Sequence, residues 1–117
     1  MKRTLCHLMI LVPSIIICLT AAAFGQGPKV ISADGGNAHT IALRDDGTVW
    51  TYGDNGAGQL GDGTWIDKNI PTRVALPRDV VAIASGPYHC LVLRSDGTVW
   101  GWGWNSYYQL GDGTNID

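Results

Sequence analysis

The sequence has 117 residues, in which eight Lys and Arg side chains stand against ten acidic ones, for a net charge of −2 at pH 7. This mildly acidic balance argues against a protein whose binding is driven by nucleic-acid phosphates. All ten acidic residues are Asp and 16 residues are Gly, a composition that favours many short strands joined by tight turns.

Residues 1–25 have the three-part pattern of a secretory signal peptide: a basic start, an apolar run over residues 5–19 and small residues just before a cleavage point ahead of Gln26. The apolar run contains Pro13 and is shorter than the roughly 20 residues that a membrane-spanning helix needs. We therefore predict a secreted, periplasmic or cell-surface protein with no membrane span after cleavage. An uncleaved N-terminal anchor is the alternative.

Cleavage would leave residues 26–117 as the folded region, with a net charge of about −4 because both basic residues at the start would be lost. Cys6 and Cys18 would also be lost, so that Cys90 alone would remain and no internal disulfide could form. Cys90 lies in the apolar stretch "HCLVL". We expect it to be buried as a small hydrophobic residue.

The folded region contains an internal repeat with a period of 50 residues. When residues 32–67 are aligned with 82–117, 19 of the 36 positions are identical, among them "DGTVW" and "QLGDGT". A period of this length is typical of propeller blades and solenoid units. We place the first unit at about 30–79 and the second at about 80–117.

Each unit is predicted to consist of β-strands. In chain order, strands are expected at 29–34, 40–43 and 48–52 in the first unit, and at 80–85, 90–93 and 98–102 in the second, because these stretches are rich in β-forming and apolar residues. Gly47 and Gly97 are expected to close tight hairpin turns in the left-handed conformation. No stretch has helical periodicity, so the predicted fold class is all-β.

The residues that could take part in catalysis or metal binding are better explained by structural roles. His39 and His89 occupy equivalent positions, and we expect each to satisfy backbone groups at the start of a strand. The Asp- and Gly-rich stretch "DNGAGQLGDGT" does not have the spacing of a calcium loop or of a phosphate loop, which leaves tight turns as its explanation. We predict no metal, no cofactor and no enzymatic activity.

The positions that differ between the units are more informative for binding. The first unit has "DNGAG" where the second has "WNSYY", and Trp65 aligns with Asn115. These differences place large aromatic side chains where the repeat does not require them, at Trp65, Trp104, Tyr107 and Tyr108. Such residues suit protein recognition, and filling space between blades is the alternative. Trp50, Trp100 and Trp102 follow the repeat and are expected in the core.

The pattern "VxxIAxGxxHxLxLxxDGxVWxWGxNxxGQLGDG" resembles the repeat of the regulator of chromosome condensation family. The residues that carry it in both units include Gly36, His39, Gly47 and Trp50, and Gly86, His89, Gly97 and Trp100. The resemblance implies blades of a seven-bladed β-propeller. About two repeats are present, so we expect either the N-terminal piece of a longer protein or several chains that assemble into a ring.

The resemblance suggests functions that the residues can be tested against. Nuclear members of the family exchange nucleotide on a small GTPase, which the predicted signal peptide and the acidic charge argue against. Plant ultraviolet-sensing members carry Gly-Trp-Arg-His-Thr, whereas residues 36–40 and 86–90 lack its Trp and Arg. Secreted bacterial members that inhibit β-lactamases through aromatic-rich loops are closer in setting.

Taken with the loop aromatics, this resemblance predicts an exported, non-catalytic repeat module that acts as a platform for a protein partner, with no nucleic-acid partner. The alternatives are a carbohydrate-binding module that stacks glycan rings on Trp65 and Trp104, and a structural cell-surface repeat.

Overall fold

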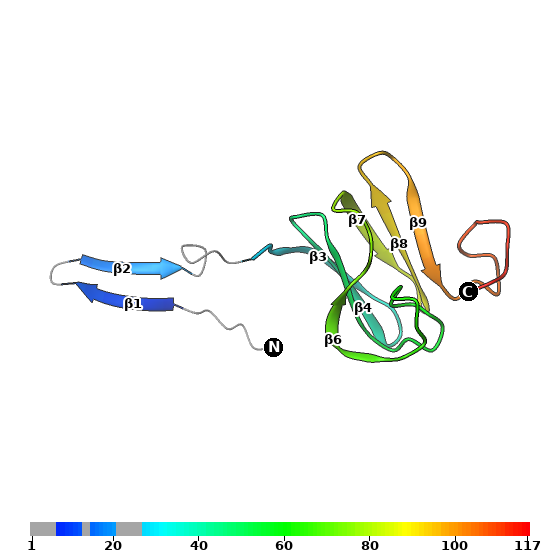
Figure 1. Ribbon diagram of the computed structural model, residues 1–117, viewed down its shortest axis with the longest axis horizontal. Helices are drawn as coiled ribbons and strands as arrows, with labels where there is room; N and C mark the ends of the chain where they lie inside the picture. Colours follow the sequence, from blue (N-terminus) through cyan, green and yellow to red (C-terminus); the bar gives the residue numbers. More distant parts are fainter. Residues whose placement is uncertain (1–6, 13–14, 21–26) are drawn as a thin grey trace.

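The computed structural model describes residues 7–12, 15–20 and 27–117, which form three separate antiparallel sheets (Figure 1). The first is a two-stranded hairpin of β1 (His7–Val12) and β2 (Ile15–Thr20), in which Val12 pairs with Ile15. No helix in the described ranges is long and apolar enough to cross a membrane. The expected cleavage point before Gln26 lies outside the described residues, so the signal peptide stays a prediction.

The first repeat unit folds into a four-stranded sheet. Its strands are β3 (Val30–Gly35), β4 (His39–Arg44), β5 (Val49–Gly53) and β6 (Lys68–Arg73), each paired with the next in chain order. The second unit repeats the first three strands as β7 (Val80–Ser85), β8 (His89–Arg94) and β9 (Val99–Gly103). The described residues contain strands and turns but no helix, which confirms the all-β prediction.

The turn between the second and third strands of each unit is the one expected from the sequence. Gly47 and Gly97 have φ angles of 75° and 85°. In the first turn the amide of Gly47 donates to the carbonyl oxygen of Arg44 at 3.0 Å. The amide of Arg44 in turn donates to the carbonyl oxygen of Thr48 at 2.9 Å. This pattern is a type I turn closed by a glycine in the left-handed region, where a side chain would be strained.

Strand β6 was not predicted, because its sequence "KNIPTR" is polar and contains Pro71. The strand lies at the edge of its sheet and pairs with β5 only in part, with an irregularity between Thr51 and Gly53. Proline lacks an amide hydrogen and is tolerated at an edge, where that hydrogen would not be needed by a neighbour. The edge position therefore explains both the composition and the missed prediction.

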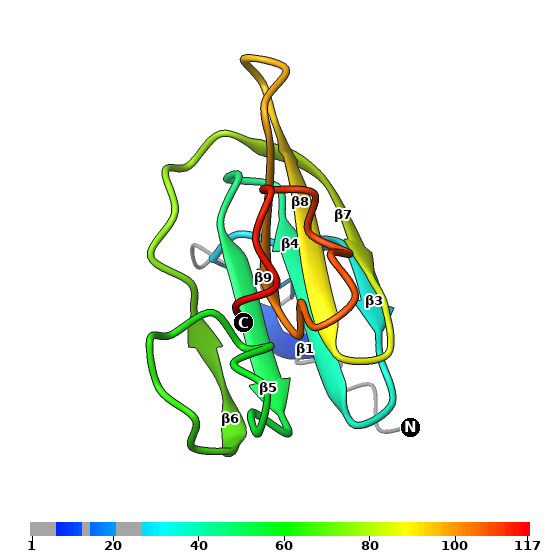
Figure 2. The same cartoon turned by 90° about the vertical axis from the view of Figure 1, so that its right-hand side faces the viewer.

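The core lies between the two larger sheets, which pack face to face with β7 next to β3 and β4 (Figure 2). Side chains alternate along β4 between buried and half-buried, as expected when one face of a sheet is covered. The fully buried residues of this core come from both units and include Ile41, Leu43, Val49, Val80, Cys90 and Val92. Residues 27–117 therefore form two blades that pack face to face.

Candidate functional site

The two blades have two different ends. At the end that we call the loop end, short turns at 36–38 and 86–88 lie beside the long segments 54–67 and 104–117. The pairing of Gly53 with His39 in the first sheet places these segments together, and the second sheet repeats the arrangement. The opposite end, which we call the hairpin end, carries the two tight turns and the connection between the blades.

A buried asparagine organises each long segment of the loop end. The amide group of Asn55 donates to two backbone oxygens of its loop, 2.8 and 3.1 Å away, and to Oδ1 of Asp62 at 3.1 Å. Its own Oδ1 accepts from the amide of Leu60 at 2.9 Å. Asn105 makes the equivalent contacts in the second unit. Both side chains are fully buried, so each fixes the path of the loop that surrounds it.

The aspartates of these loops also act on the backbone. Asp62 Oδ1 accepts from the amide and the hydroxyl of Thr64 at 2.9 and 2.7 Å, and Gly61 and Gly63 have φ angles of 68° and 77°. These are the tight turns expected from the sequence. Among the described residues no three His, Cys, Asp or Glu side chains are grouped as metal ligands would be.

Three aromatic rings gather at the loop end of the second blade. The ring of Trp104 lies 5.6 Å from that of Tyr88 and 5.2 Å from that of Tyr107, and both contacts are edge-to-face. We call Tyr88, Trp104 and Tyr107 the aromatic cluster. The structure thus brings together two of the four predicted loop aromatics and adds Tyr88, which aligns with Ala38 of the first unit. The difference between Ala38 and Tyr88 at this aligned position is a signal in the sequence from which Tyr88 could have been predicted.

Tyr108 is a predicted loop aromatic held in an unusual backbone conformation. Its φ is 62°, whereas the equivalent residue of the first unit is Gly58 with a φ of 72°. A side chain in this left-handed region costs roughly 1–2 kcal/mol relative to the right-handed one. The tyrosine ring is 62% exposed, so burial of the ring does not offset this cost. The backbone strain at Tyr108 is therefore not explained by packing of its ring.

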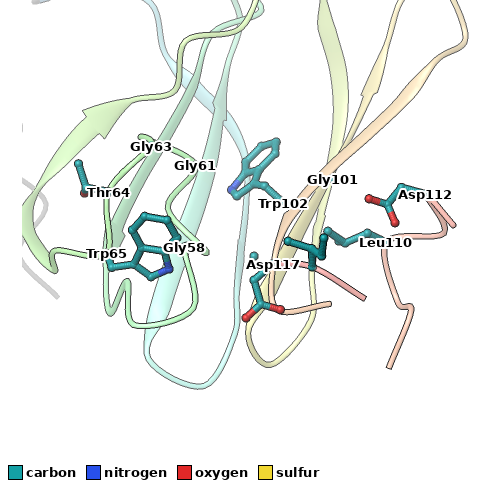
Figure 3. Close-up of a pocket in the computed structure, with 12 residues that line it drawn as sticks. Gly58, Gly61, Gly63, Thr64, Trp65, Gly101, Trp102, Leu110, Asp112 and Asp117 are labelled. Carbon is teal, nitrogen blue, oxygen red and sulfur yellow. The ribbon is translucent and has the colours of Figure 1, made fainter. Parts of the chain in front are cut away.

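The fourth predicted aromatic residue, Trp65, lines a pocket between the blades. The pocket has a volume of about 430 Å³, and Figure 3 shows Trp65 on the first blade facing Trp102, Leu110, Asp112 and Asp117, which belong to the second blade. Trp65 is 66% exposed. We call this space the interblade pocket. It lies at the loop end, because Trp65 and Asp112 belong to the two long segments of that end.

The junction between the blades contains a buried polar cluster. His39 Nε2 lies 2.9 Å from Ser85 Oγ and 3.2 Å from Cys90 Sγ, both in the second unit. His39 therefore bonds side chains of the next blade, and the expectation that its ring satisfies backbone groups at the strand start is wrong. Gly36 packs on this ring, because a Cβ added there would overlap the His39 Cε1 atom. Gly86 is placed against His89 in the same way.

The chemistry of this cluster is that of a structural junction. Cys90 is fully buried as expected, and burial raises the pKa of its thiol to about 12. The thiolate, which is the nucleophilic form, is therefore not populated near neutral pH. Burial also lowers the pKa of His39, against the smaller opposing effect of the Asp54 carboxylate. His39 Nδ1 is buried without a hydrogen-bond partner among the described residues.

The repeat-conforming tryptophans do not all lie in the core. Trp102 is partly buried against it and donates from Nε1 to the carbonyl oxygen of Gln59 at 2.9 Å. Trp50 is half-buried, but Trp100 is 49% exposed, which contradicts the expectation of a core position. The reason is that β9 is the outer strand of its sheet. The guanidinium of Arg94 lies over the Trp100 ring, 5.4 Å from the ring centroid.

Comparison with known families gives matches over most of the two blades. Residues 30–59 and 80–109 match the family model described as regulator of chromosome condensation (RCC1) repeat, and a second model with the same description matches residues 46–93. The human E3 ubiquitin-protein ligase HERC2 is 54% identical over 39 residues, which are 33% of this chain and 1% of that protein. An RCC2 homolog from Danio rerio is 50% identical over 44 residues, which are 37% and 9%.

Solved structures show the same fold. Yeast RCC1 (Prp20), in a complex with Kap60, superimposes with a TM-score of 0.70 at 19% identity, covering 79% of this chain and 24% of the other. Human WBSCR16 superimposes with a TM-score of 0.67 at 28% identity, covering 87% and 26%. The chain therefore spans about a quarter of these structures and less than a tenth of the curated relatives named above.

Proposed function

The chain belongs to the regulator of chromosome condensation (RCC1) repeat family, and we propose that it is an exported, non-catalytic β-propeller module that binds a protein partner through its loop end. The observation that carries the proposal is the aromatic cluster. It stands on loops whose equivalents in the first unit have small or polar residues. The relative Prp20 was solved with a protein bound, which is consistent with a platform of this fold.

The exposure of the aromatic side chains supports a protein partner. Tyr107 is 76% exposed, next to the strained and exposed Tyr108. Tyrosine and tryptophan are enriched among the residues that contribute most to protein interfaces, because they bury a large area at a small entropic cost. Within the cluster, the edge-to-face contacts of Trp104 hold the rings in place before binding. A preformed surface loses less entropy when it binds.

The non-catalytic part of the proposal rests on the blade junction. Cys90, His39 and Ser85 are the described residues that most resemble a nucleophile with its base, but they lie between the blades. The thiol has no access to solvent and a raised pKa. A reaction would need both a substrate path and a thiolate, so this cluster suits a packing role.

Export rests on the pattern of residues 1–25, and it can be tested directly. Expression of the full chain in a host with a secretory pathway should release a product whose N-terminal residue is Gln26. A product that keeps Met1 and stays in the cell would remove export from the proposal while leaving the binding role open.

Site-directed photocrosslinking tests the binding role. We would replace Tyr107 by p-benzoylphenylalanine in the full chain and place the same probe at Arg78, an exposed residue of the hairpin end. A protein adduct from position 107 that is absent from position 78 is expected. Equal adducts from both positions, or none from position 107, would refute the platform. An adduct removed by glycosidases but not by protease would favour the carbohydrate-binding alternative, in which Trp65 and Trp104 stack on sugar rings.

A further inference from the structure

Charge is divided unequally between the two ends of the blades. Among residues 27–117, the hairpin end carries five basic residues and four aspartates, whereas the loop end carries six aspartates and one basic residue, Lys68. The aspartates of the loop end are Asp34, Asp54, Asp62, Asp67, Asp112 and Asp117. The end that displays the exposed aromatic residues is therefore also the negative end of the described structure.

These carboxylates are held in place by the fold. Asp117 Oδ1 accepts from the amide of Asn105 at 2.6 Å, as Asp67 Oδ1 does from Asn55 at 2.8 Å. Asp112 accepts from the backbone amide and the hydroxyl of Thr114 and from the side-chain amide of Asn105. These hydrogen bonds, with that from the Thr114 amide the largest, lower the pKa of the Asp112 carboxyl. A carboxylate has about four lone-pair sites, so each of these groups can accept further hydrogen bonds from a ligand.

The interblade pocket combines aromatic rings with two of these carboxylates. Its lining includes Trp65, Trp102, Leu110, Asp112 and Asp117, and none of its lining residues is Lys or Arg (Figure 3). An apolar wall with carboxylates at one side matches the side chain of lysine or arginine, which has an apolar stem and a cationic head. Aromatic rings attract such a head through their electron-rich faces.

The protein itself shows this kind of contact at the hairpin end. Arg44 lies 5.3 Å from the ring centroid of Trp50, and Arg94 lies 5.4 Å from that of Trp100. These are the two cation–π contacts found in the described part of the chain. Trp65 has no such partner there, although its ring is more exposed than that of Trp100.

The pocket is particular to this junction because the two units differ at its wall. The Trp65 indole lies against Gly58, where an added Cβ would be 3.9 Å from Nε1. In the second unit Trp65 is replaced by Asn115 and Gly58 is replaced by Tyr108. The aromatic residue of this pair of positions is therefore the later one in the first unit and the earlier one in the second. The repeat does not require the Trp65 ring, and its place beside the carboxylates is specific to the first unit.

We propose that the interblade pocket receives a lysine or arginine side chain, so that the protein partner presents a basic segment to the loop end. This inference rests on the proposed function and adds the chemistry of the partner to it. The cationic head lies between the Trp65 ring and the carboxylates of Asp112 and Asp117, while the aromatic cluster contacts the neighbouring residues of the partner.

Titration of the full chain with two matched peptides tests the inference. The probes are N-acetylated, C-amidated (Gly-Arg)4 and its (Gly-citrulline)4 counterpart, which has nearly the same shape without the charge. Calorimetry should show the arginine peptide binding at least about tenfold more tightly. Trp65→Ala and Asp117→Asn should each weaken it by about fivefold or more. The amide oxygen introduced by Asp117→Asn can still accept from the amide of Asn105, so the loop is expected to stay intact.

Asp45→Asn is the matched control, because it removes the same charge from an exposed residue of the hairpin end. Its binding should stay within about twofold of the parent protein. Equal binding of the two peptides, binding of neither, or an equal loss in Asp45→Asn would overturn the inference, and the comparison of the two peptides does not depend on any variant folding. The photocrosslink at position 107 distinguishes failure of this inference from failure of the proposed function. If the crosslink forms but the arginine peptide does not bind more tightly than the citrulline peptide, the protein-binding function stands and only the cationic partner is wrong.

Discussion

Two glycines with the same backbone conformation allow the packing at the blade junction to be measured. Gly61 and Gly111 are equivalent in the repeat, and each has a φ of 68°. A Cβ added at Gly61 would lie 2.7 Å from Nε1 and 2.8 Å from Cε2 of Trp102, whereas one added at Gly111 would meet nothing within 4 Å. Gly61→Ala and Gly111→Ala therefore share their backbone strain and differ only in the contact with Trp102.

The expected magnitudes follow from these contacts. The left-handed conformation costs an alanine roughly 1–2 kcal/mol, which should be the whole effect of Gly111→Ala. In Gly61→Ala the indole must also shift. The shift weakens the hydrogen bond from Trp102 Nε1 to the Gln59 carbonyl oxygen, worth about 1 kcal/mol, and costs about 1 kcal/mol or more in packing. We expect Gly61→Ala to be less stable than Gly111→Ala by about 2 kcal/mol.

Urea unfolding followed by tryptophan fluorescence measures both variants under the same conditions, with the midpoint and the slope fitted separately. The difference between the two free energies of unfolding is the informative quantity, because the shared backbone term cancels. If the variants differ by less than about 0.5 kcal/mol, Trp102 does not pack against the first blade as described, and the interblade pocket loses one of its walls.

Three further results are expected. Asn55→Ala should lower the free energy of unfolding by about 3 kcal/mol, because it leaves several buried polar groups of the loop unpaired. The control Asn37→Ala, at an exposed position, should change the free energy of unfolding by less than about 0.5 kcal/mol. Similar losses in the two variants would mean that the buried Asn55 amide does not support the loop. The free energy of unfolding should fall as the pH drops below about 6.5, because burial lowers the pKa of His39 in the folded state and the unfolded chain then binds a proton more readily. In His39→Gln this loss of stability should be absent. If the variant keeps the same pH profile between about pH 7.5 and 5.5, the pH dependence belongs to another group. Cys90 should react with a thiol reagent about 100-fold or more slowly than a free thiol in the folded protein and at the normal rate in urea; fast labelling without urea would show that the junction opens.

Most of the scaffold could be predicted from the sequence because local and repeated information agree. The period of 50 residues, the alternation along β4 and the Asp-Gly turns all point to the same strands. Strand β6 was missed because its formation depends on β5 beside it rather than on its own residues, which include Pro71. Similarly, the exposure of Trp100 depends on which strand lies at the edge of the sheet, and a single unit of sequence does not contain that information.

The site was predicted less completely, because it is made of contacts between units. The sequence identified Trp65 and Trp104 as aromatics that the repeat does not require, but it could not show that Trp65 lines a pocket with Asp112 or that Trp104 packs on Tyr88. The role of His39 was also misjudged, since its ring reaches Ser85 in the next blade. Contacts between residues so far apart in the chain become visible only when the blades are stacked.

The repeated residues and the residues that differ between the units have different roles in the long loops, and this difference indicates which loop positions are available for binding. The buried Asn55 and Asn105 already satisfy the backbone groups of the long loops. Exposed positions of these loops, such as Tyr107 and Tyr108, can therefore vary between the units, and Tyr108 can accept backbone strain without loss of the loop. Because the aspartates that cap these loops are part of the repeated framework, every aromatic residue added to the loop end is placed among negative charges. These repeated aspartates are the scaffold's contribution to the proposed preference for a cationic partner.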